Sequence, residues 1–165
     1  MEIRPIELKD AEHYLLLNKR IDESGFMLHE PGEKQLTVTQ QQAFIERVIQ
    51  TKSTALFVAD DGEDLVGFIL AIGGTVRRNR HSAYIVVGID EAYRGQGLAT
   101  KLFEEIFVWA RDMKISRLEL TVIKENKKAY DLYRQLGFSV EGEKIHSLMV
   151  DGRPINEYYM YKFVE

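Results

Sequence analysis

Val86-Val87-Gly88-Ile89 is a run rich in β-branched residues, and the residues that follow it are Asp90-Glu91-Ala92-Tyr93-Arg94-Gly95-Gln96-Gly97-Leu98-Ala99-Thr100. This order predicts a strand, an acidic turn with two glycines, and a helix that begins at Leu98. A helix N-terminus has backbone N–H groups without intrahelical partners and carries the positive end of the helix dipole. Small residues there let an anion approach the bare backbone, so the stretch predicts a phosphate-binding turn. Two glycines alone leave a plain turn open as the alternative.

The rest of the chain predicts a mixed α/β sheet of about seven strands flanked by four helices. Residues 82–89, 98–113 and 115–123 form the one parallel strand-helix-strand crossover in an otherwise antiparallel succession. The remaining strands are expected at 2–6, 55–59, 65–76, 138–150 and 155–164, and the remaining helices at 8–24, 39–51 and 125–136. No linker or repeat divides the chain, so we expect a single domain over residues 1–165.

Three local signals refine this pattern. Thr39-x-x-Gln42 is expected to form a capping box at the start of the second helix. The stripe of that helix is expected to consist of Phe44, Ile45, Val48 and Ile49. Asp151-Gly152 predicts a hairpin turn between the last two strands.

Composition excludes several classes of protein. The chain has 165 residues, 45% of them hydrophobic, and a net charge of -4, which argues against nucleic acid as the main partner. It has no cysteine, which excludes disulfides and thiolate metal sites and favours a cytoplasmic location. No apolar run is long enough to suggest a membrane span. His13, His81 and His146 have no metal-ligand spacing, so no metal is expected.

The glycine-containing turn does not match the common nucleotide-binding motifs. Thr100 stands where a dinucleotide fingerprint requires its third glycine. A Walker A loop would require Gly-Lys-Ser/Thr, which is absent. A nucleoside triphosphate enzyme is therefore disfavoured.

A second block begins where the 115–123 strand ends and runs from Asn126 to Phe138. Asn126 is expected to cap a helix through its side-chain oxygen, and Gly137 is expected to end that helix, so structure alone explains both residues. Tyr133 lies on the inward helical face, where its hydroxyl needs a partner. A plain core position is the alternative for Tyr133.

Together the two blocks resemble the GNAT superfamily of acyl-CoA-dependent N-acyltransferases. The family's acyl-CoA signature, Gln/Arg-x-x-Gly-x-Gly/Ala, corresponds to Arg94, Gly97 and Ala99. Its second block, Asn-x-x-Ala-x-x-Leu-Tyr-x-x-x-Gly-Phe, corresponds to Asn126, Ala129, Leu132, Tyr133, Gly137 and Phe138. The resemblance extends over the whole chain, and Glu141 to Met160 is similar to the ribosomal-protein and polyamine acetyltransferase branches.

The resemblance implies a site for acetyl-CoA as cosubstrate. In the family the strand before the turn splays from its parallel neighbour, and pantetheine pairs with the freed backbone. Gly88 is expected in a bulge, with the N–H of Ile89 donating to the thioester carbonyl. The expected catalytic residues are Tyr133 as general acid, Asn126 and Ile89. The expected acetyl-CoA-binding residues are Val87, Gly88, Ile89, Arg94, Gly95, Gln96, Gly97, Leu98, Ala99, Thr100, Asn126, Ala129 and Tyr133.

The implied reaction is transfer of the acetyl group to a primary amine by direct attack in a ternary complex. A non-catalytic acyl-CoA sensor or structural module is the alternative. The acceptor is a small amine or a protein N-terminus, and a homodimer stays open. Thr121 stands where the ribosomal-alanine branch has a glutamate, so the base is left among Glu119, Glu23, His29, Glu30 and a water relay.

Overall fold

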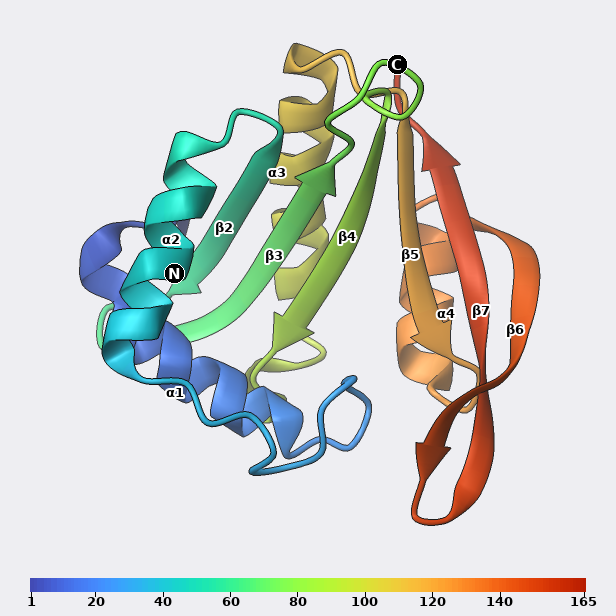
Figure 1. Ribbon diagram of the computed structural model, residues 1–165, viewed down its shortest axis with the longest axis horizontal. Coiled ribbons are helices and arrows are strands. Elements are labelled where there is room, and N and C mark those ends of the chain that lie inside the picture. The colour runs from blue at the N-terminus through green and yellow to red at the C-terminus, as the bar shows by residue number, and fades with distance from the viewer.

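A seven-stranded mixed sheet runs through the computed structural model, which describes residues 1–165 (Figure 1). The strands lie in the order β1-β2-β3-β4-β5-β7-β6. They are β1 (Glu2–Pro5), β2 (Thr54–Asp60), β3 (Leu65–Gly73), β4 (Ser82–Ile89), β5 (Arg117–Ile123), β6 (Ser139–Val150) and β7 (Arg153–Phe163). Only β4 and β5 are parallel. The predicted mixed sheet is confirmed.

Four α-helices cover the two faces of this sheet. They are α1 (Ala11–Asp22), α2 (Val38–Gln50), α3 (Leu98–Asp112) and α4 (Lys127–Gln135), with 3₁₀ turns at Leu8–Asp10 and Glu91–Tyr93. Figure 1 shows α1 and α2 on one face and α3 and α4 on the other. Because side chains alternate along a strand, Phe68 and Leu70 pack under α1 and α2, whereas Ile69 and Ala71 pack under α3. The central strand β3 thus joins two cores.

The feature that positions the site is the short contact between β4 and β5. The two strands pair only at Ser82–Arg117, Ala83–Leu118 and Tyr84–Glu119. Beyond Tyr84 they diverge, whereas β4 stays paired with β3 up to Ile89. The predicted splayed parallel pair is therefore present.

The start of α2 differs from the prediction. The capping box is formed by Thr37 and Gln40, not by Thr39 and Gln42. Each side chain accepts a hydrogen bond from the other residue's backbone N–H, at 3.1 Å and 2.9 Å. Both residue pairs have the spacing of a capping box, but Thr37 has the extended backbone that an N-cap requires.

The predicted apolar stripe of α2 is only partly correct. Ile45 and Val48 are buried as expected, whereas Ile49 is 57% exposed and Phe44 is half-buried. Gln41 lies one turn before Ile45 and is buried in place of an apolar residue. This exchange of a hydrophobic for a polar side chain bears on the site described below.

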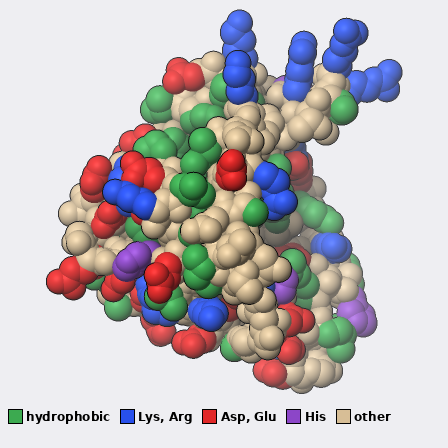
Figure 2. Space-filling view, turned by 60° about the vertical axis from the view of Figure 1, so that its left-hand side comes forward, with side chains coloured by type: hydrophobic (Ala, Val, Ile, Leu, Met, Phe, Trp, Pro, Cys, Tyr) green, Lys and Arg blue, Asp and Glu red, His purple; other side chains and the backbone are tan.

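The ends of the molecule carry two further features. The β6–β7 hairpin turns at Asp151 and Gly152, both with positive φ as predicted for such a turn, and it extends past the other strands in Figure 1. Arg77, Arg78 and Arg80 are exposed in the β3–β4 connection, at the end where Figure 2 shows basic side chains projecting. None of the helices has the length and apolar character needed to span a membrane.

Candidate active site

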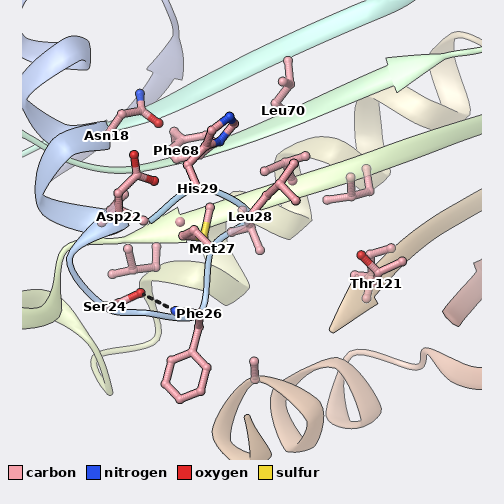
Figure 3. A pocket seen from close by; sticks show the side chains of 18 of the residues that line it. Asn18, Asp22, Ser24, Phe26, Met27, Leu28, His29, Phe68, Leu70 and Thr121 are labelled. Carbon is pink, nitrogen blue, oxygen red and sulfur yellow. Dashed lines mark hydrogen bonds between the residues drawn. The ribbon is translucent and has the colours of Figure 1, made fainter. Parts of the chain in front are cut away.

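A large cavity opens where β4 and β5 diverge. Its volume is about 1000 Å³, and its walls come from α1, the 24–36 segment, α2, the central strands, α4 and the last hairpin. Figure 3 shows Asn18 and Asp22 projecting from α1 on one side and Thr121 on β5 at the other. The lining is mostly hydrophobic, so polar groups that face the cavity stand out.

The backbone of β4 presents hydrogen-bonding groups to this cavity. The N–H of Asp90 donates to the carbonyl of Val66 at 2.9 Å, and the β3–β4 ladder continues from there without a register shift. Because backbone groups alternate in direction along an antiparallel ladder, the N–H groups of Val87 and Ile89 point away from β3. No residue of β5 pairs with either. Both N–H groups therefore face the gap.

Gly88 lies in a regular part of β4, and the expected bulge there is wrong. Its own backbone groups face β3, opposite Phe68. A Cβ at this position would lie 2.7 Å from Phe68 Cε1 and 2.9 Å from Ile21 Cδ1. A glycine stands here because α1 packs directly against the strand, and this packing brings the end of α1 to the cavity.

The N-terminus of α3 is open, as the sequence predicts. Gly97 is the N-cap residue with a φ of 76°, and no side chain caps the first turn. Gly95 also has positive φ, and nothing lies within 4 Å of the position a Cβ would take at either glycine. The N–H groups of the first turn are thus free for an anion.

The other residues of this turn fall into two groups. Arg94 and Ala99 line the cavity, and Arg94 Nε donates to the carbonyl of Ile89 at 3.3 Å. Gln96 and Thr100 lie outside the cavity lining, and Leu98 is buried in the core, so only its backbone can reach a ligand.

The second motif supplies the opposite wall. Asn126, Ala129 and Tyr133 all line the cavity. Asn126 caps α4, since its Oδ1 accepts from the N–H of Ala129 at 3.3 Å, and its amide NH₂ is left free to donate. The predicted cap at Asn126 is confirmed.

Tyr133 combines a buried ring with a hydroxyl that is open to the cavity. The side chain is 8% exposed and packs edge-on against Phe103 and Phe138. The hydroxyl makes no hydrogen bond within the chain, yet no fully enclosed polar atom lacks a partner, so it must reach the cavity. Burial raises the pKa of Tyr133, with a smaller contribution from Tyr84. A phenol already holds its proton at neutral pH, since its ordinary pKa is about 10, and burial reinforces this.

The four candidate bases are not equivalent in the structure. His29 lines the cavity, whereas Glu23 and Glu30 do not. Glu119 accepts a hydrogen bond from Arg117 at 3.1 Å and lies outside the lining. Thr121 lines the cavity and exchanges a hydrogen bond of 2.9 Å with the hydroxyl of Tyr84.

Sequence reasoning missed the two buried polar residues of the cavity wall. Asp22 and Gln41 are 7% and 3% exposed, and both line the cavity. Asp22 lies four and eight residues after Asn18 and Tyr14, so all three share one face of α1. This polar row within an apolar face was the available signal.

Comparison with known proteins identifies the family. A family model described as the acetyltransferase (GNAT) family matches residues 20–138. The chain belongs to the GNAT family. Like its relatives, this GNAT protein is an N-acetyltransferase that uses acetyl-CoA.

Relatives of similar length support this assignment. The spermidine N(1)-acetyltransferase of Escherichia coli K12 is 27% identical over 164 residues, covering 99% of this chain and 86% of the relative. The crystal structure of a GNAT-family acetyltransferase from Streptococcus pneumoniae superposes with a TM-score of 0.94 at 26% identity, covering 99% of both chains.

A more distant structure shares the fold alone. The phosphinothricin acetyltransferase of Sinorhizobium meliloti, solved in complex with acetyl-CoA, has a TM-score of 0.86 at 15% identity, covering 99% of this chain and 88% of that one. The GNAT fold predicted from the two motifs is thus confirmed.

Proposed function

We propose that this protein transfers the acetyl group of acetyl-CoA to a primary amine by direct attack within a ternary complex. The observation that carries the proposal is the gap beyond Tyr84, where unpaired N–H groups of β4 lie across the cavity from the phenol of Tyr133. A thioester held against β4 would lie between a hydrogen-bond donor and an acid. That is the arrangement acyl transfer requires.

Residues of the splayed strand β4 and of the N-terminus of α3 are suited to bind acetyl-CoA, the acetyl donor. Val87 and Ile89 offer N–H groups that a pantetheine amide can pair with, as an added strand would. The first-turn N–H groups from Gly95 to Thr100 would hold the pyrophosphate, with Arg94 adding positive charge. Gly88 leaves room for α1 beside the thioester, while Asn126 and Ala129 would contact the pantetheine arm.

The chemistry needs two donors and one proton acceptor. The N–H of Ile89 would stabilise the negative charge that develops on the thioester oxygen as the amine nitrogen attacks. Tyr133 would donate its proton to the sulfur as the carbon–sulfur bond breaks. The proton released by the amine would leave through His29 or a water. The chain has no cysteine that could carry a covalent acyl intermediate.

The acceptor is proposed as a small amine or a protein N-terminus. The E. coli relative acts on spermidine, which supports an alkyl amine for this chain. The size and largely hydrophobic wall of the cavity suit a carbon skeleton beside the reacting nitrogen.

Thiol release from acetyl-CoA with a panel of amines tests this function. We expect free CoA to appear only when a suitable amine is present, with acetyl-CoA alone as the control. If calorimetry detects no binding of acetyl-CoA or CoA, the proposal fails. Binding without thiol release for any amine would instead favour a non-catalytic sensor.

A further inference from the structure

Asp22 is a buried carboxylate without a partner. It is the last residue of α1 and is 7% exposed. Its carboxylate takes part in no hydrogen bond and no ion pair within the chain. The C-terminus of a helix carries the negative end of the helix dipole, which disfavours an anion there. Three unfavourable features therefore coincide at one side chain.

Asp10 shows what a satisfied buried carboxylate looks like in this protein. It is 5% exposed and receives hydrogen bonds from Arg4 at 2.8 Å and 2.9 Å, and from the N–H of Glu7 at 2.8 Å. Buried charges in proteins are normally paired in this way. The chain has just two buried carboxylates, and Asp22 is the one left unpaired.

The missing partner of Asp22 must come from the cavity. No fully enclosed polar atom lacks a hydrogen-bond partner, so the carboxylate oxygens are open to the space that Asp22 lines. The same reasoning applies to the amide of Gln41, which is 3% exposed, unpartnered and part of the same wall. Of the three buried polar side chains, Asp10, Asp22 and Gln41, the last two therefore have unpaired polar groups that face the same cavity.

The charged groups nearest Asp22 do not replace that ligand. Lys34 and His29 act favourably on the carboxylate and Glu33 unfavourably, and none forms an ion pair with it. Burial outweighs these influences and raises the pKa of Asp22. The same wall carries aromatic side chains, among them Tyr14, Phe44 and Phe68, beside polar ones such as Asn18.

We propose that Asp22 binds the ammonium group of the acetyl acceptor, which is a primary amine on an apolar carbon skeleton. The inference rests on the proposed function, since it assigns the acceptor to this cavity. Ile21 packs on Gly88 of β4, so the adjacent Asp22 holds the amine on the side of β4 where the thioester is expected. The apolar part of the wall takes the carbon skeleton, and the carboxylate selects for positive charge. The bound ammonium loses one proton through His29 or a water before its nitrogen attacks the thioester.

The test compares the wild-type protein with D22N and with E12Q. D22N removes the charge but keeps the shape, and Glu12 is an exposed carboxylate on the same helix outside the cavity. Binding of n-butylamine, 2-phenylethylamine and spermidine to the CoA-loaded protein is measured by calorimetry. We expect D22N to raise the dissociation constants of the amines that bind by about 10-fold or more, as for loss of a buried charged hydrogen bond. E12Q should leave these dissociation constants unchanged.

Two further readouts separate a binding role from a structural one. The CoA dissociation constant should be equal in all three proteins. The thermal midpoint of the ligand-free D22N should equal or exceed that of the wild type, because an unpaired buried charge is removed. A clearly lower midpoint would show a structural role and contradict the proposal.

The proposal is also overturned if D22N binds the amines as tightly as the wild type, or if the CoA-loaded wild type binds none of them. Thiol release is followed separately. If the amines bind through Asp22 but no thiol is released, the proposed transfer is wrong while the ammonium site stands.

Discussion

Tyr133 shows how one side chain can serve both packing and chemistry. Its ring belongs to the larger core with Phe103 and Phe138, and the same burial raises the pKa of its phenol. An acid that delivers a proton to a thiolate must hold that proton until the bond breaks. The core therefore holds the ring, and with it the hydroxyl, in one position beside the cavity.

We expect Tyr133→Phe to lower turnover by roughly 10²–10⁴-fold, the usual contribution of a general acid. The acetyl-CoA dissociation constant should stay unchanged, because the ring remains in place. Steady-state kinetics and calorimetry measure the two quantities. Tyr130→Phe is the matched control, since Tyr130 lies on α4 but outside the cavity. Full activity of Y133F would remove the acid role.

Gly88 is the second residue whose size matters. Gly88→Ala places a methyl group 2.7 Å from Phe68 and 2.9 Å from Ile21, so we expect about 1–3 kcal/mol of destabilisation from overpacking. Urea denaturation measures this loss. In the control Gly142→Ala the new methyl would lie 3.6 Å from Tyr159, an ordinary contact. Equal stability of both variants would show that α1 can move away from β4.

At the scale of elements, the Arg4–Asp10 pair fastens the edge strand to the start of α1. Arg4 on β1 also contacts Asp60 on β2 at 3.0 Å, so one guanidinium joins three segments. Burial alone would raise the pKa of Asp10, but the hydrogen bonds from Arg4 and from the N–H of Glu7 outweigh it and lower the pKa below 3.8.

This pair predicts acid sensitivity. Because the pKa of Asp10 is lowered in the folded state, its stabilisation is present above pH 3.8 and is lost as the pH falls through the folded-state pKa. Asp10→Asn should lower the free energy of unfolding by about 3–5 kcal/mol relative to the wild type at neutral pH, as for a broken buried ion pair. Urea titrations from neutral to acid pH should show this difference shrinking below about pH 4. Asp112→Asn, at an exposed position, should show no such trend.

At the scale of the whole molecule, β3 contributes side chains to both cores, so the sheet cannot unfold on one face alone. We predict one cooperative unfolding transition, in agreement with the single domain expected from the sequence. Circular dichroism and the fluorescence of Trp109, the sole tryptophan, should report the same midpoint. CoA should raise that midpoint by binding only the folded protein. Two separate midpoints would contradict a single domain.

The sequence was sufficient for the fold and for one half of the candidate site. Strand alternation and helical periodicity depend on local spacing, so the element order and the cap at Asn126 could be predicted. The polar wall made by Asp22 and Gln41 could not, because a polar residue within an apolar stripe has the same local pattern whether it faces water or a cavity. The packing of α1 on Gly88 decides between the two, and that contact joins distant parts of the chain.

The short pairing of β4 with β5 also separates two tasks along the chain. The residues proposed to select the acceptor lie in α1 and α2, before β4, whereas Asn126 and Tyr133 lie after β5. Substitutions in the early helices can therefore change which amine is accepted without disturbing the group that protonates the departing sulfur. Related enzymes can therefore differ in the amine that they acetylate while they keep the same reaction.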